Sequence, residues 1–217
     1  MVMAKTERQF LPAAGHDWFL PLYDPITKIF GMDRARVRLL EQAGLQPHYR
    51  VLDVGCGTGT LAVQVKQVHP MVDVVAADPD PKALARAWRK AERAGVSIQF
   101  DEGFSDALNY ADAVFDRVFS SMMLHHVKRD ERENTLREIR RVLKPGGRLE
   151  FLDFDQPEPG TSRLARLLHS NVALSGNTED RLLASMARAG FVQARRTGRE
   201  HRWFGRLGFY QAAAPQQ

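Results

Sequence analysis

The central part of the chain alternates short apolar runs with stretches in which apolar residues recur every three or four positions. Such alternation is typical of a parallel β-sheet whose strands are connected by helices. The pattern predicts five strands in this part of the chain, at residues 51–54, 72–77, 96–100, 115–120 and 148–154. The sequence therefore predicts an α/β protein with a doubly wound sheet.

The helix predicted after the second strand has clear signals at both ends. Asp80 is placed to cap it, Pro81 occupies its first position, where a missing N–H costs nothing, and Gly95 ends it. Its buried face is expected to contain Leu84, Trp88 and Ala91.

Two segments flank this predicted core, which spans residues 49–154. Residues 1–48 are expected to form an N-terminal helical cap with an aromatic-rich beginning. Residues 155–217 are expected to add two lid helices and two strands, at 191–196 and 207–212. These strands would form an antiparallel hairpin on the sheet edge. We therefore expect one domain with a seven-stranded, mostly parallel sheet.

Composition narrows the class of protein. The chain has 217 residues, which suits one domain, and its single cysteine excludes an internal disulfide and an all-cysteine metal site. It contains no apolar run long enough for a membrane-spanning helix, and its N-terminus lacks the pattern of a signal peptide. We expect a soluble cytoplasmic protein without a transmembrane segment, for which peripheral membrane contact stays open.

The charge is moderately basic, with 31 Lys and Arg residues against 26 Asp and Glu residues. Five arginines crowd the C-terminal part: Arg195, Arg196, Arg199, Arg202 and Arg206. We interpret them as a solvated surface of the hairpin, in a basic connection between its strands, with contact to an acidic partner or substrate as the alternative. A nucleic-acid partner is not expected, and the oligomeric state is not predicted.

A glycine-rich segment after the first predicted strand is the most informative stretch. Gly55, Gly57 and Gly59 would permit a tight turn and let a ligand approach the backbone closely. The helix that follows presents unpaired N–H groups, which suit an anionic group. The spacing is Gly-x-Gly-x-Gly, whereas a dinucleotide-binding loop has Gly-x-Gly-x-x-Gly. A tight turn without a ligand is the alternative interpretation.

Two carboxylates accompany this loop. Asp53 lies inside an apolar strand, and a buried carboxylate needs a partner, so it would face a ligand ammonium or order the amides of the loop. Asp78 ends the second predicted strand, where it could accept hydrogen bonds from ribose hydroxyls. Asp80 fills the helix-capping role better, which leaves Asp78 for the ligand.

The loop sequence Leu52-Asp53-Val54-Gly55-Cys56-Gly57-Thr58-Gly59 resembles the signature of class I S-adenosylmethionine-dependent methyltransferases. Two later stretches resemble the next conserved blocks of that family: Phe115-Asp116-Arg117-Val118 and Arg141-Val142-Leu143-Lys144-Pro145-Gly146-Gly147. The match covers residues 49–154 and is closest to the ubiquinone/menaquinone methyltransferase-like group. It implies a Rossmann-like fold, S-adenosyl-L-methionine as cofactor, and methyl transfer to a small-molecule or lipid-like acceptor by in-line displacement.

The resemblance also implies a pose for the cofactor. Gly55, Cys56 and Gly57 would lie along its methionine part, Asp78 would hold the ribose, and Pro79 would pack on the adenine. Phe104 stands where the family commonly has an aspartate that contacts the adenine amino group. Adenine recognition is therefore expected to use apolar packing and backbone or Ser105 groups. Ser120 and Ser121 would lie where the methyl group emerges.

No catalytic acid or base stands out, because an activated methyl donor mainly requires alignment of the acceptor. His125 and His126 could deprotonate a hydroxyl acceptor, or they could simply line the cofactor site or pack structurally. Tyr23 could cover the cofactor or touch its sulfonium, or it could anchor the N-terminal segment. The two histidines are adjacent and lack the spacing of metal ligands, so no metal is expected.

The acceptor pocket would be walled by the N-terminal aromatic segment and by residues 161–175. Two other functions are kept as alternatives. One is a nicotinamide-dependent oxidoreductase on a similar fold, and the other is a protein that binds S-adenosylmethionine without catalysis.

Overall fold

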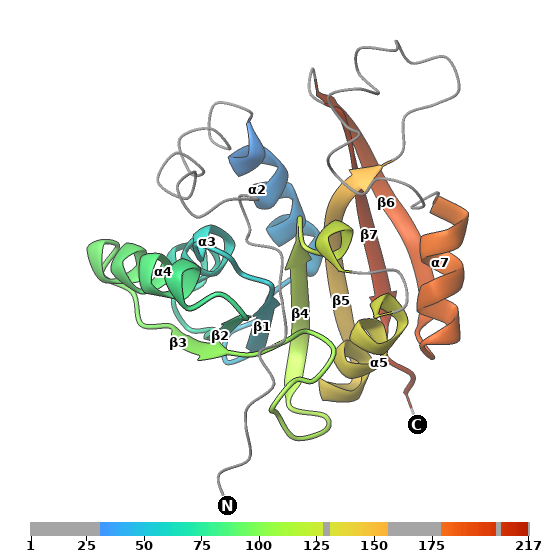
Figure 1. The fold of residues 1–217 in the computed structure, drawn as a ribbon, viewed down its shortest axis with the longest axis horizontal. Helices are drawn as coiled ribbons and strands as arrows, with labels where there is room; N and C mark the ends of the chain where they lie inside the picture. Colours follow the sequence, from blue (N-terminus) through green and yellow to red (C-terminus); the bar gives the residue numbers. More distant parts are fainter. Residues whose placement is uncertain (1–30, 128–130, 156–178, 203–204, 217) are drawn as a thin grey trace, which may run out of the picture.

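The structure, a computed structural model, describes residues 31–127, 131–155, 179–202 and 205–216 (Figure 1). These residues form a seven-stranded sheet in the order β3-β2-β1-β4-β5-β7-β6. Strands β1 to β5 pair in parallel, and β7 is antiparallel to both of its neighbours, β5 and β6. The predicted doubly wound, mostly parallel sheet with an antiparallel hairpin at its C-terminal edge is confirmed.

The strands are β1 (Arg50–Val54), β2 (Asp73–Asp78), β3 (Gln99–Glu102), β4 (Phe115–Ser121), β5 (Leu143–Asp155), β6 (Val192–Arg202) and β7 (Gly205–Ala213). The helices are α2 (Met32–Ala43), α3 (Thr60–Val68), α4 (Pro81–Arg93), α5 (Arg132–Val142) and α7 (Glu179–Arg188). A 3₁₀ turn, η2 (Leu124–His126), follows β4.

The sheet separates two apolar cores. On one face, Val51 of β1 packs with residues of α2 and α3, and on the other face Leu52 packs with residues of α5 and α7. Neighbouring residues of one strand point to opposite faces, so a central strand that is buried on both faces consists of consecutive apolar residues. This is why residues 51–54 could be recognised as a strand from the sequence.

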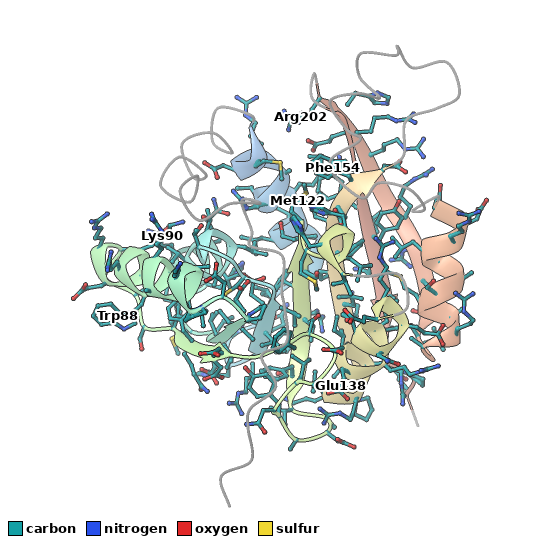
Figure 2. All side chains as sticks on the ribbon, in the orientation of Figure 1. Trp88, Lys90, Met122, Glu138, Phe154 and Arg202 are labelled. Carbon is teal, nitrogen blue, oxygen red and sulfur yellow. The ribbon has the colours of Figure 1, made fainter. Side chains whose placement is uncertain are left out.

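Helix α4 packs through small residues, which corrects the predicted buried face. Its buried residues are Ala83, Ala87 and Ala91, whereas Trp88 is 57% exposed. The packing leaves little room, because a Cβ added at Gly59 would lie 2.7 Å from the Cβ of Ala87. A tryptophan does not fit so close to the loop and α3, and Figure 2 shows Trp88 on the outer side of α4. The cap is as predicted, since Asp80 accepts a hydrogen bond from the Lys82 amide at 2.8 Å.

The basic C-terminal segment also differs from the prediction. Four of its five arginines lie within strand β6, which extends to Arg202, so the segment is not a basic connection between strands. Acidic partners allow this arrangement: Arg196 pairs with Glu179, and the Nε of Arg199 lies 2.6 Å from the Asp155 carboxylate. Charges that are paired in this way can occupy a strand next to the rest of the sheet.

The described helices include none with both the length and the apolar character needed to cross a bilayer. In the same part of the chain, no group of three or more His, Cys, Asp or Glu side chains is arranged to hold a metal ion. Tyr23, a candidate for covering the cofactor, lies outside the described residues, and so do residues 161–175, which were expected to wall the acceptor pocket.

Candidate active site

The glycine-rich loop joins β1 to α3 at the carboxyl end of the central strand. β1 lies between β2 and β4, so the chain order reverses here, and ligands of open α/β sheets bind at such a point. The amides of Gly55 and Cys56 both donate to the Ala77 carbonyl of β2, at 2.8 and 3.1 Å. These bonds hold the first part of the loop against the neighbouring strand.

Gly55 is required at its position for two reasons. Its φ of 69° is in the left-handed region, and an added Cβ would lie 2.1 Å from Cγ of Met123. Met123 precedes the η2 turn, so the loop packs directly against the segment that follows β4. The absence of a side chain at Gly55 thus allows the loop and the segment before η2 to pack closely.

Asp78 connects the end of β2 to the loop. Its Oδ2 accepts a hydrogen bond from the Gly57 amide at 2.8 Å, and its Oδ1 accepts one from the Asp80 amide at 2.9 Å. Burial raises the pKa of Asp78, while these two hydrogen bonds act in the opposite direction. Each carboxylate oxygen can accept a second hydrogen bond, so Asp78 can order the loop and still accept from a ribose hydroxyl.

Asp53 carries a buried oxygen that the described part of the chain leaves unpaired. The residue is 1% exposed, and its Oδ2 has no hydrogen-bond partner among the described residues. Burial raises the pKa of Asp53 to about 7, an effect that Arg36 opposes and Asp78 reinforces. A buried carboxylate without a partner is costly, and a ligand ammonium would supply both charge and hydrogen bonds. This orphaned oxygen fits the amino group of S-adenosyl-L-methionine.

The end of β4 also carries buried polar atoms without a hydrogen-bond partner among the described residues. The Oγ atoms of Ser120 and Ser121 are buried and have no partner among the described residues. The next residue, Met122, has a φ of 60°, an uncommon value for a residue with a side chain. Strained backbone of this kind is concentrated at functional sites. The predicted pair of serines therefore lies at a strand end with unused hydrogen-bonding capacity.

The segment with Phe104 and Ser105, which is predicted to meet adenine, lies beside the end of β2. The Gly103 amide donates to the Asp78 carbonyl at 3.2 Å, which brings the segment with Phe104 and Ser105 beside β2. Pro79, Phe104 and Ser105 are all partly exposed, as an adenine-binding surface requires. The Ser105 hydroxyl lies 3.2 Å from that of Thr135 on α5, so it already has a partner. Packing by Phe104 and Pro79 is the feature of the adenine prediction that this geometry favours.

The two histidines have different environments. Nδ1 of His125 lies 2.6 Å from Oδ1 of Asp153, and both residues are buried. His126 stacks at a tilt on His125, with 4.0 Å between ring centroids. Burial, reinforced by His125, lowers the pKa of His126 to about 4, so this ring is neutral near pH 7. The structure therefore distinguishes two residues that were equivalent in the sequence.

Cys56 is part of the loop through its backbone. Burial, together with the charges of Asp53 and Asp78, raises the pKa of its thiol well above the usual range. A thiol that resists ionisation is a poor nucleophile. This agrees with the expectation that its main chain, and not its sulfur, faces the cofactor.

Three residues near the site were missed by the sequence analysis. Lys90 of α4 donates to the hydroxyls of Thr58 and Thr60, at 3.1 and 2.6 Å, and so ties α4 to the loop (Figure 2). Met123 fills the space beside Gly55, and Asp153 binds His125. Lys90 and Met123 have no distinctive sequence signal. Asp153 does have one, because it is an acid inside an apolar strand, as Asp53 is.

Comparison with known proteins agrees with this geometry. A methyltransferase domain family matches residues 51–147, from β1 into β5. Demethylmenaquinone methyltransferase from Thermus thermophilus is 39% identical over 143 residues, which cover 64% of this chain and 64% of that protein. A ubiquinone/menaquinone biosynthesis C-methyltransferase from Pasteurella multocida is 31% identical over 161 residues, 71% of this chain and 59% of that protein. The matched region thus spans less than two thirds of either relative.

The fold is similar to that of the YcgJ protein from Bacillus subtilis, with a TM-score of 0.73 and 16% sequence identity over 85% of this chain and 100% of that one. The sheet order is that of the Rossmann-like methyltransferase fold. Residues 51–147 thus match a methyltransferase domain of the class I S-adenosyl-L-methionine-dependent type, and the chain is related to the demethylmenaquinone and ubiquinone/menaquinone enzymes. The family resemblance inferred from the loop sequence is confirmed.

Proposed function

We propose that the chain transfers a methyl group from S-adenosyl-L-methionine to a small-molecule acceptor with a hydroxylated, quinol-like ring. The observation that carries the cofactor assignment is a buried Asp53 oxygen that has no partner among the described residues. It precedes a glycine loop that Asp78 holds in place. The acceptor class is suggested by the relatives, whose names specify demethylmenaquinone and ubiquinone/menaquinone as the compounds concerned.

When bound, the cofactor supplies a methyl group that is already activated on a positively charged sulfur. The residues of the chain would bind and orient it. Asp53 would hold the ammonium, and Asp78 would accept from the ribose while it keeps the Gly57 amide in position. Pro79 and Phe104 would pack on the adenine. Their partial exposure supports this role.

The methyl group would leave the cofactor near the ends of β1 and β4. Ser120 and Ser121, whose hydroxyls are buried and unpartnered among the described residues, would line this region and exclude bulk water. Exclusion of water and alignment of the acceptor are the main contributions that a protein makes to such a displacement. A lipid-like acceptor would bring the protein to a membrane surface.

The test is transfer of a radiolabelled methyl group. Purified protein is incubated with S-adenosyl-L-[methyl-³H]methionine and either 1,4-dihydroxynaphthalene or demethylmenaquinol, and the label in the extracted acceptor is counted. We expect time-dependent labelling that stops when S-adenosylhomocysteine is added. Cofactor binding without labelling of these acceptors or of an amine, thiol and lipid panel would favour the non-catalytic alternative.

A nicotinamide-dependent oxidoreductase is the second alternative, and the loop argues against it. Its glycine spacing differs from that of a dinucleotide loop, and the Gly57 amide already points to Asp78. Hydride transfer from NADH to a quinone, measured as a loss of absorbance at 340 nm, would support the oxidoreductase. We expect no such loss.

A further inference from the structure

A buried histidine–aspartate pair lies at the carboxyl ends of β4 and β5. The two strands are parallel neighbours, with Ser121 of β4 beside Leu152 of β5, so the residues that follow are brought together. His125 belongs to the η2 turn after β4, and Asp153 follows Leu152. Figure 2 shows Met122 and Phe154, which flank this pair along the chain, close together at the same end of the sheet.

The Asp153 carboxylate contacts both the main-chain amide and the imidazole ring of His125. Oδ1 of Asp153 lies 2.6 Å from Nδ1 of His125, and Oδ2 accepts from the His125 amide at 3.1 Å. The Phe154 amide also donates to Oδ1, at 2.8 Å. A carboxylate can only accept, so Nδ1 carries the proton and donates it. The tautomer that results leaves the lone pair on Nε2, the nitrogen that can act as a base.

The segment that contains His125 packs against the cofactor loop through Met123. Met123, two residues before His125, occupies the space that a side chain at Gly55 would need. The intervening backbone is strained at Met122, and the unpartnered serines of β4 precede it. His125, whose ring Asp153 fixes, therefore belongs to the segment that connects the end of β4 to the contact with the cofactor loop. His126, kept neutral by burial, is not bonded to Asp153.

We propose that His125, oriented by Asp153, is the general base that removes the proton of a hydroxyl on an aromatic or enolic ring of the acceptor. This proposal rests on the proposed methyl transfer and specifies its acceptor chemistry. His125 would be a catalytic residue and Asp153 a positioning residue that fixes the tautomer of the base.

The step balances as follows in atoms and charge. The acceptor proton moves to Nε2 of His125, and the electron pair left on the oxygen, or on the ring carbon conjugated with it, forms the bond to the methyl carbon. The sulfur–methyl bond breaks and its electron pair stays on sulfur, which gives neutral S-adenosylhomocysteine. When ring carbon takes the methyl group, its own proton is lost to water. His125 then releases its proton to solvent.

The acceptor class follows from acidity. A phenolic hydroxyl has a pKa of about 10 and imidazole one of about 6.5, a gap that a positioned base can bridge during the reaction. An aliphatic alcohol is far less acidic, and a neutral amine already carries the electron pair it needs. A histidine held by a carboxylate is thus best matched to a hydroxyl on an unsaturated ring.

The experiment uses His125→Asn and Asp153→Asn with tritiated methyl transfer to 1,4-dihydroxynaphthalene. In Asp153→Asn the amide offers one acceptor oxygen and one NH₂ donor, so it cannot accept from the His125 main chain, the His125 ring and the Phe154 amide at once, as the carboxylate does. We expect kcat to fall about 10²- to 10⁴-fold in both variants, while the dissociation constant for S-adenosylhomocysteine stays within about twofold. His69→Asn, at the C-terminus of α3, is the matched control and keeps the wild-type rate.

Two readouts separate a base from a structural role. The fall in kcat of the two variants should be smaller with a chlorinated dihydroxynaphthalene. The hydroxyl of this acceptor is more acidic, so its deprotonation depends less on the base. In ¹⁵N spectra of histidine-labelled protein, His125 should show the Nδ1–H tautomer in the wild type, the form that leaves the lone pair on Nε2. The tautomer measurement needs no substrate and also serves if one variant folds poorly.

Each contrary result has a distinct meaning. Equal rates for His125→Asn and wild type, equal losses for both acceptors, or an Nε2–H tautomer in the wild type would overturn the base proposal alone. Methyl transfer restricted to amines or thiols would overturn the base proposal together with the ring acceptor of the proposed function, and would leave methyl transfer itself in place. A wild-type protein that binds S-adenosylhomocysteine but labels no acceptor would overturn the proposed function, and the base with it.

Discussion

Asp78 illustrates how one carboxylate can serve both the protein and a ligand. It accepts amide hydrogen bonds from Gly57 and Asp80, so its removal would loosen the loop as well as release a ribose. Asp80 is buried nearby, but it caps α4 through the Lys82 amide. The two aspartates can therefore be compared directly, because both are buried but only Asp78 is proposed to bind the ligand.

We predict that Asp78→Ala weakens the binding of S-adenosylhomocysteine by about 1.5–3 kcal/mol, the usual cost of losing a charged hydrogen-bond acceptor. Asp80→Ala should lower the free energy of unfolding by about 1 kcal/mol, as loss of a helix cap does, with affinity unchanged. Calorimetric titration and denaturant unfolding measure the two effects. Equal affinities for Asp78→Ala and the wild type would remove the ribose assignment.

The raised pKa of Asp53 makes cofactor binding sensitive to pH. Burial places this pKa near 7, so the carboxyl is mostly neutral at pH 6 and mostly charged at pH 8. Only the charged form attracts a ligand ammonium. We predict that the affinity for S-adenosylhomocysteine rises about five- to tenfold between pH 6 and pH 7.5 and then levels off.

The matched variant is Asp53→Asn, which keeps the size of the side chain and removes its titration. Its affinity should be low and nearly constant over the same pH range. Titration calorimetry at each pH provides the comparison. An affinity in the wild type that is constant, or that falls toward higher pH, would contradict the proposed contact between Asp53 and the ammonium.

At the scale of elements, the contact between the glycine loop and the η2 turn is the feature most specific to this site. Gly55 and Gly95 both have positive φ, at 69° and 65°. A Cβ at Gly55 would collide with Met123, whereas a Cβ at Gly95 would meet nothing within 4 Å. Substitution by alanine thus imposes backbone strain at both sites but a steric clash at only one.

We predict that Gly95→Ala lowers the free energy of unfolding by about 1 kcal/mol, the cost of a left-handed alanine. Gly55→Ala should lower it by about 2–4 kcal/mol, because overpacking adds to the strain, and should also weaken cofactor binding. In the Gly55→Ala background, Met123→Ala should restore part of the loss. Thermal unfolding and calorimetric titration of the two single variants and the double variant measure the changes in stability and in affinity. Similar losses of stability in Gly95→Ala and Gly55→Ala would count against the loop–turn contact.

The elements show how far sequence patterns reach. The strands of the central sheet were predictable, because burial on both faces requires consecutive apolar residues. The buried face of α4 was not, because Trp88 and Leu84 fit a helical stripe as well as Ala83 and Ala87 do. The choice between them is made by the close approach of α3 and the loop, a contact between elements that periodicity within one helix does not contain.

For the whole molecule, the pairing of the C-terminal arginines bears on possible partners. Arg196 and Arg199 pair with Glu179 and Asp155, and Arg202 pairs with Glu200. Charges that are neutralised within the protein contribute little to attraction of a phosphate backbone. We predict no binding of a 20-nucleotide RNA or a DNA duplex up to about 1 μM protein in 50 mM salt, a condition that favours electrostatic association. Fluorescence anisotropy provides the measurement, and salt-dependent binding at that concentration would contradict it.

The candidate site was predictable in outline because its parts are local in sequence. The loop from Gly55 to Gly59 follows a recognisable strand, Asp53 lies inside that strand, and Asp78 ends the next one. The partner of His125 was not predictable, because it depends on the register of two strands about 30 residues apart in the chain. An acid within an apolar strand was the available signal for Asp153, but its partner required the assembled sheet.

The central claim is that the glycine loop after β1 and the end of β4 bind an adenosyl sulfonium. The most direct measurement is calorimetric titration of the purified protein with S-adenosylhomocysteine, and separately with NAD, at pH 8. The account predicts saturable binding of S-adenosylhomocysteine at one site per chain, a large loss of affinity in Asp78→Ala, and no heat of binding with NAD. Saturable binding of NAD, with none of S-adenosylhomocysteine, would contradict it.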